Sequence, residues 1–99
     1  MIGPREYTGP RILVESIVPS LEAKAIDVHE VFPREDINSQ TIWGLKCQRN
    51  KGSVRIGITI RSDGHADFSL LFDSCRSANR LLADEIDSLL TRFGASKCN

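Results

Sequence analysis

The residues that could carry chemistry in this sequence include three cysteines and two histidines, and they are widely spaced. Cys47, Cys75 and Cys98 form no CxxC pair and no zinc-binding pattern. A catalytic thiol needs a neighbouring base, and nothing in the sequence places His29 or His65 beside one of the cysteines. The cysteines are therefore expected to be structural, with Cys47 in a core and Cys98 on a loose tail.

Other catalytic and metal-binding patterns are also absent. The sequence has no GxSxG, P-loop or HExxH motif. His65 stands near Asp63 and Asp67 in a way that resembles a fragment of a metal site, but a tight exposed turn does not bring three ligands together. We therefore expect a protein that is not an enzyme and that uses no metal or other cofactor.

Length and charge limit the remaining functions. The chain has 99 residues, of which 40% are hydrophobic, so it is expected to form a single domain over residues 1–99. Its 13 basic residues balance 13 acidic residues, whereas a dedicated binder of nucleic acid is usually basic. No apolar run approaches the roughly 20 residues of a membrane span, and residues 1–6 lack a signal region. A cytoplasmic protein without a membrane partner is expected.

A helix is expected near the N-terminus. Residues 1–9 contain two glycines and a proline and are predicted to be a loose lead-in. After Pro10, the positions Leu13, Ile17, Leu21 and Lys24 recur at helical spacing. A strand over residues 11–18 is the alternative, because that segment is rich in Ile and Val.

Four strands are expected next. They cover residues 25–32, 41–49, 53–61 and 65–73, with a polar loop at 34–40. The third has strict alternation of apolar and polar residues, and Asp63-Gly64 is a strong hairpin signal. A second helix should follow, with an apolar stripe at Ala78, Leu82, Ile86, Leu89 and Phe93, widened by Leu81 and Leu90. Gly94 should end it, and residues 95–99 should form a loose tail.

The expected fold is an α+β two-layer sandwich: an N-terminal helix, a four-stranded antiparallel β-meander, and a C-terminal helix packed on one sheet face. The other sheet face should be open. Gly44 and Gly57 would be flat spots on it, where another backbone can approach closely.

The candidate partner-binding residues lie on this open face and in the acidic loop beside it. They are Lys46, Arg55, Thr59, Arg61, Asp67, Ser69 and Asp73 on the face, and beside it Glu35 and Asp36 from the loop with Glu30 from the strand before it. A nucleic-acid partner is the alternative, because the basic residues cluster around the hairpin from Lys46 to Arg61. Neighbouring aspartates and the lack of interleaved aromatics favour a protein instead. A homodimer through the open face or an edge strand would also cover these residues.

About half of the chain, from Leu21 to Phe72, resembles the small bacterial TriTu-type immunity proteins of polymorphic toxin systems. Their hairpin typically reads R-x-G-R-L-T-V-W-x-x-G-x-x-x-L-E-V, and residues 55–70 here read RIGITIRSDGHADFSL. The runs AIDV, EVFP and SQTIW before it are also similar, whereas Arg61 stands where the family usually has Trp. The resemblance implies a non-enzymatic protein that binds and neutralises a cognate toxin domain, and it supplies no catalytic residues.

Overall fold

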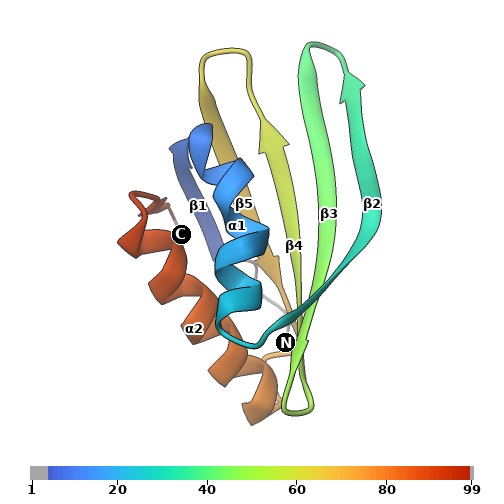
Figure 1. Ribbon diagram of the computed structural model, residues 1–99, viewed down its shortest axis with the longest axis vertical. Coiled ribbons are helices and arrows are strands. Elements are labelled where there is room, and N and C mark those ends of the chain that lie inside the picture. The colour runs from blue at the N-terminus through green and yellow to red at the C-terminus, as the bar shows by residue number, and fades with distance from the viewer. Residues whose placement is uncertain (1–4, 99) are drawn as a thin grey trace.

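A six-stranded antiparallel sheet with two helices on one side forms the protein in the computed structural model, which describes residues 5–98. The helices lie in front of β1, β5 and β4, and the β2–β3 hairpin extends beside them (Figure 1). The elements in chain order are β1 (Arg5–Pro10), α1 (Ile12–Ala23), β2 (Asp27–Ile37), β3 (Gln40–Arg49), β4 (Gly52–Ile60), β5 (His65–Leu71), α2 (Ser77–Arg92) and β6 (Ser96–Lys97).

The α+β class and the antiparallel sheet agree with the sequence prediction, but the sheet has six strands instead of four. Its order is β2-β3-β4-β5-β1-β6. β1 pairs with β5 and lies where a loose lead-in was expected, and β6 pairs with β1 inside the expected loose tail. Residues 1–4 and 99 of those two predicted segments lie outside the described residues. Both strands are short, and their hydrogen-bond partners are distant in sequence. Local sequence patterns do not indicate such pairing.

The helical interpretation of residues 12–23 is correct, and the alternative strand over 11–18 is wrong. α1 buries Leu13, Val14, Ile17 and Leu21, whose spacing places them on one helical face. This face joins the same core as the inward residues of β4 and β5.

α2 packs beside α1 through a narrower stripe than the sequence suggested. Leu82, Ile86, Leu89 and Leu90 are buried, whereas Leu81 and Phe93, which were predicted to join them, are exposed. The start of the helix is fixed by Asn79, which is 6% exposed. Its side chain accepts a hydrogen bond from the Ser53 N–H at 2.8 Å and donates one to the Asp73 carbonyl at 3.1 Å.

Tyr7 connects the sheet to α2. Its ring is buried, and its hydroxyl donates a hydrogen bond to the Asp87 carboxylate. Burial, followed by the bond to Asp87, raises the pKa of the Tyr7 hydroxyl. The strand that was expected to be a loose lead-in is therefore anchored in the core.

β2 is longer and less regular than predicted. It continues through most of the expected 34–40 loop to Ile37, and its pairing with β3 shifts between Glu30 and Phe32 and again between Phe32 and Glu35. Pro33 lies in the second irregularity, at the edge of the sheet, where its missing N–H leaves no sheet partner unsatisfied.

Candidate protein-binding face

A row of paired residues with two glycines and a serine at its centre runs across the strands in the middle of the open sheet side. Gly44 of β3 pairs with Gly57 of β4, which pairs with Ser69 of β5, which pairs with Glu6 of β1. At the other end, Phe32 of β2 pairs with Gly44. These five residues are called the glycine row below.

The two glycines of the row have different surroundings. A Cβ on Gly44 would lie 2.8 Å from the Phe32 Cβ, so the close approach of β2 leaves no room for a side chain there. A Cβ on Gly57 would have only the Ser69 Cβ within 4 Å, at 4.0 Å. Gly57 therefore leaves a real hollow in the middle of the face.

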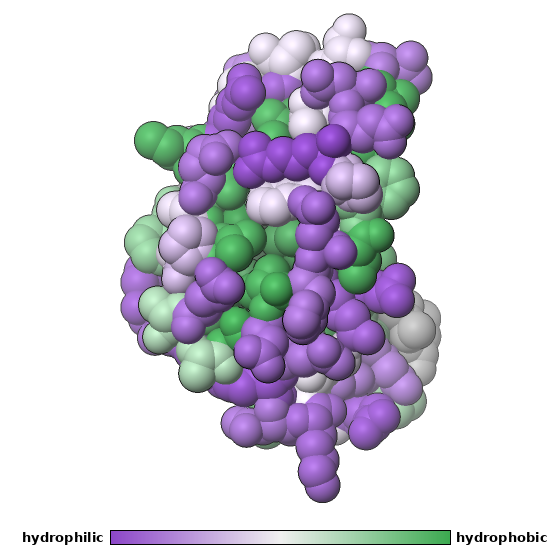
Figure 2. Space-filling model, turned by 45° about the vertical axis from the view of Figure 1, so that its right-hand side comes forward, coloured by the Kyte–Doolittle hydropathy of each residue, from purple (hydrophilic) through white to green (hydrophobic). Residues whose placement is uncertain are grey.

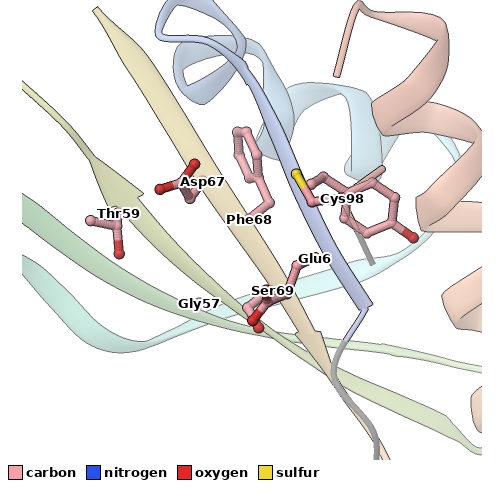
Figure 3. Close-up of a pocket in the computed structure, with 8 residues that line it drawn as sticks. Glu6, Gly57, Thr59, Asp67, Phe68, Ser69 and Cys98 are labelled. Carbon is pink, nitrogen blue, oxygen red and sulfur yellow. The ribbon is translucent and has the colours of Figure 1, made fainter. Parts of the chain in front are cut away.

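Two shallow pockets extend from this hollow. One, of about 310 Å³, lies toward β2 and is lined by Phe32, Ile42 and Gly44 among others. The second, of about 340 Å³, lies toward β1 and is lined by Glu6, Asp67 and Cys98 among others (Figure 3). Gly57, Thr59 and Ser69 line both pockets. The pockets therefore form one cross-strand groove.

Charge is divided between the two flanks of this groove. On one flank Glu35, Ile42, Thr59 and Asp67 follow one another across the strands. On the other flank the succession is His29, Lys46, Arg55 and Leu71. Carboxylates and hydroxyls thus face the basic side chains across the glycine row.

Arg61 holds the hairpin end of the acidic flank. Its Nε lies 3.6 Å from both an Asp63 and an Asp67 carboxylate oxygen, and its Nη2 is 3.4 Å from the Thr8 hydroxyl. The hydrogen bond from the His65 N–H, together with the charge of Arg61, lowers the pKa of Asp63. These contacts indicate that Arg61 organises the turn as well as contributing to the face.

The predicted site residues fall into two groups. Lys46, Arg55, Thr59, Asp67 and Ser69 lie together on the open side as the alternation predicted, and Arg61 lies at its end. Asp73 lies beyond β5, where its carboxylate accepts a hydrogen bond from the Cys75 N–H at 3.0 Å.

The acidic loop residues are not brought together. Glu35 pairs with Ile42 on the open side. Glu30 pairs with Leu45 on the covered side, and Asp36 accepts a hydrogen bond from the Thr41 hydroxyl there at 2.5 Å. Of the three carboxylates expected beside the open face, only Glu35 lies there, because Glu30 and Asp36 belong to a strand whose side chains alternate between faces.

Phe32 and Glu6 were missed by the sequence reasoning. Phe32 reaches the open side only because the first shift in pairing advances β2 by a residue. Glu6 belongs to the segment expected to be loose. Alternation in REYTGP, with Tyr7 inward, is the one signal that could have indicated it.

A clasp on the covered side holds β2 in place. The Arg34 guanidinium lies 4.3 Å from the centre of the Trp43 ring and 3.0 Å from Glu15 of α1. The Trp43 Nε1–H donates to Glu30 at 2.6 Å. Figure 2 shows hydrophobic side chains near the centre of the view, with hydrophilic side chains lying across them. The clasp fixes the strand that carries Phe32.

Cys47 is enclosed and the other two cysteines are exposed. Burial raises the pKa of the Cys47 thiol to about 12, so it remains protonated at neutral pH. Among residues 5–98, no group of three His, Cys, Asp or Glu side chains is arranged to hold a metal ion. Neither helix in that range is long and apolar enough to cross a membrane.

The chain matches no protein-family model, and no curated protein or solved structure matches it either. Its function therefore has to be argued from the residues and geometry of the open side.

Proposed function

We propose that this protein is a non-enzymatic binding module that docks a protein partner on its open sheet side. The observation that carries this proposal is the cross-strand groove, with an unfilled hollow at Gly57 and apolar side chains beside it. A standard interface buries about 800 Å² per partner, or about one seventh of the 5709 Å² accessible surface of this domain. The broad open side of the sheet can supply that area.

A protein is favoured over nucleic acid because both signs of charge lie within the same face. Lys46 and Arg55 are cross-strand partners and would attract phosphates. Glu6 and Asp67, however, line the adjacent groove and would repel them. Mixed charges suit a protein surface, where they set orientation and specificity. Nucleic-acid binding through the hairpin from Lys46 to Arg61 is the alternative tested below.

The biological role that we propose is that of an immunity protein, which acts in the cytoplasm by covering a cognate bacterial toxin domain. The resemblance of residues 21–72 to TriTu-type immunity proteins supports this role. A small scaffold with one broad open face is also physically suited to occlusion, because such binding needs a surface and no catalytic group.

The proposal is tested by capturing partners from native lysate with three tagged proteins, each with and without nuclease. These are the wild type, Gly57→Val, and the control Ser88→Val, which introduces the same valine side chain at an exposed position of α2. Filling the hollow should abolish capture while Ser88→Val retains it, and nuclease should have no effect. The captured protein should carry a toxic activity that the complex suppresses.

Two results would contradict the proposal. Capture of the same protein by Gly57→Val would move the binding site away from the groove. Recovery of nucleic acid alone, abolished by nuclease and by Lys46→Glu/Arg55→Glu, would favour the basic hairpin. Arg61 is left unchanged in this double variant because it contacts Asp63 and Asp67.

A further inference from the structure

The two ends of the cross-strand groove have opposite chemical character. Toward β2 the lining is apolar and includes the side chains of Phe32, which is 45% exposed, and Ile42. Toward β1 the lining includes the carboxylates of Glu6 and Asp67 and the hydroxyls of Thr59 and Ser69 (Figure 3). A ligand that fits both ends therefore needs an apolar group at one end and a cation at the other.

The two carboxylates are not equally engaged. Asp67 lies 3.6 Å from the Arg61 Nε and is partly neutralised by it. Within residues 5–98, the exposed Glu6 side chain forms no hydrogen bond or ion pair. Glu6 is therefore the carboxylate that is available to a cation from outside.

The spacing of the two ends fits an extended peptide. Glu6 lies two strands from Gly57 along the glycine row, which is about 10 Å at a strand separation of about 4.8 Å. In an extended chain, side chains two residues apart point to the same side at about 6.6 Å separation. A long basic side chain spans the remaining distance.

Resting on the proposed function, we propose that the groove recognises an extended segment of the partner protein that crosses the strands. A bulky apolar side chain of this segment fills the hollow over Gly57, and a Lys or Arg two residues away pairs with Glu6.

A second copy of this chain fits the face less well. A two-fold axis along the glycine row would bring the basic flank of one copy onto the acidic flank of the other. The same axis would lay Gly57 on Gly57 and Glu6 on Glu6, which leaves the hollow empty and opposes like charges. A partner with a protruding apolar side chain satisfies both the hollow and the charges.

The test is a selection of random twelve-residue peptides displayed on phage against the immobilised whole protein. Enriched sequences should carry an aromatic or large aliphatic residue and a Lys or Arg two positions away. Synthetic copies should bind Gly57→Val at least tenfold more weakly in fluorescence polarisation. A new selection against Glu6→Lys should replace the basic residue by Asp or Glu at the same spacing.

The control is Glu22→Lys, the same charge change at an exposed position of α1, which should leave the selected sequences unchanged. Three results would each overturn the inference: no enrichment, equal binding to Gly57→Val, or a charge preference that ignores position 6. They would leave the proposed function standing if capture of the intact partner still depended on Gly57. If capture of the intact partner does not depend on Gly57 either, the proposed function is contradicted as well.

Discussion

The covered and open sides of the sheet are built from alternate residues of the same strands, yet they have opposite properties. On the covered side of β4, Val54, Ile56, Ile58 and Ile60 are each at most 5% exposed. On its open side, Arg55, Gly57 and Thr59 leave a charged flank and a hollow. Stability and the proposed partner binding therefore rest on different atoms, so a substitution can change one property without the other.

The largest expected difference in stability is between substitutions of two neighbouring residues of β5 that point to opposite sides of the sheet. Phe68→Ala removes a ring that is 1% exposed on the covered side and should cost about 3–5 kcal/mol of unfolding free energy. Ser69→Ala, on the open side, should change it by less than about 0.5 kcal/mol. Urea denaturation of both variants measures the contrast, and equal losses would contradict it.

A smaller effect is expected where the covered side contains a polar bond. Tyr7→Phe removes the donor to the Asp87 carboxylate and should cost about 1–3 kcal/mol at neutral pH. Because burial raises the pKa of Tyr7 in the folded protein, its stabilisation is present below about pH 10 and lost as the pH rises above that value.

The wild type should therefore lose more stability between pH 9 and pH 11 than Tyr7→Phe does, by about 1 kcal/mol. Denaturation curves at both pH values compare the two proteins. Identical pH dependence would mean that the tyrosine hydroxyl is not held in the folded state as described.

The smallest expected effect distinguishes the paired glycines of the open side. Gly44→Val should destabilise by about 1 kcal/mol, because its Cβ would lie 2.8 Å from that of Phe32. Gly57→Val has open space and should stabilise by about 0.5 kcal/mol through reduced freedom of the unfolded chain and better strand propensity. Thermal unfolding of both variants measures the difference. A destabilised Gly57→Val would show that the hollow is structurally required.

The register of the open side could be predicted from sequence because alternation in residues 53–61 is strict and Asp63-Gly64 fixes the following hairpin. A shift of one residue would have exposed the whole Ile and Val set. This is why Lys46, Arg55, Thr59 and Asp67 were placed together correctly.

The two ends of the groove could not be predicted in the same way. Phe32 reaches the open side through a pairing shift in β2, and such shifts have no clear local signature near Pro33. Glu6 belongs to a strand whose existence depends on β5, far along the chain. Both features arise from tertiary pairing, whereas sequence patterns report local preference.

The position of β1 also predicts the order in which the fold is completed. β1 lies between β5 and β6 in the sheet. Arg5 therefore cannot pair until Leu70 has been synthesised, and Tyr7 cannot pair with β6 until Lys97 has been synthesised. During synthesis the hairpins from β2 to β5 can close over short loops, whereas β1 must close a much longer one. β1, the first of these strands in chain order, is thus expected to be among the last to be incorporated. Until it docks, β5 presents an unpaired edge to other chains.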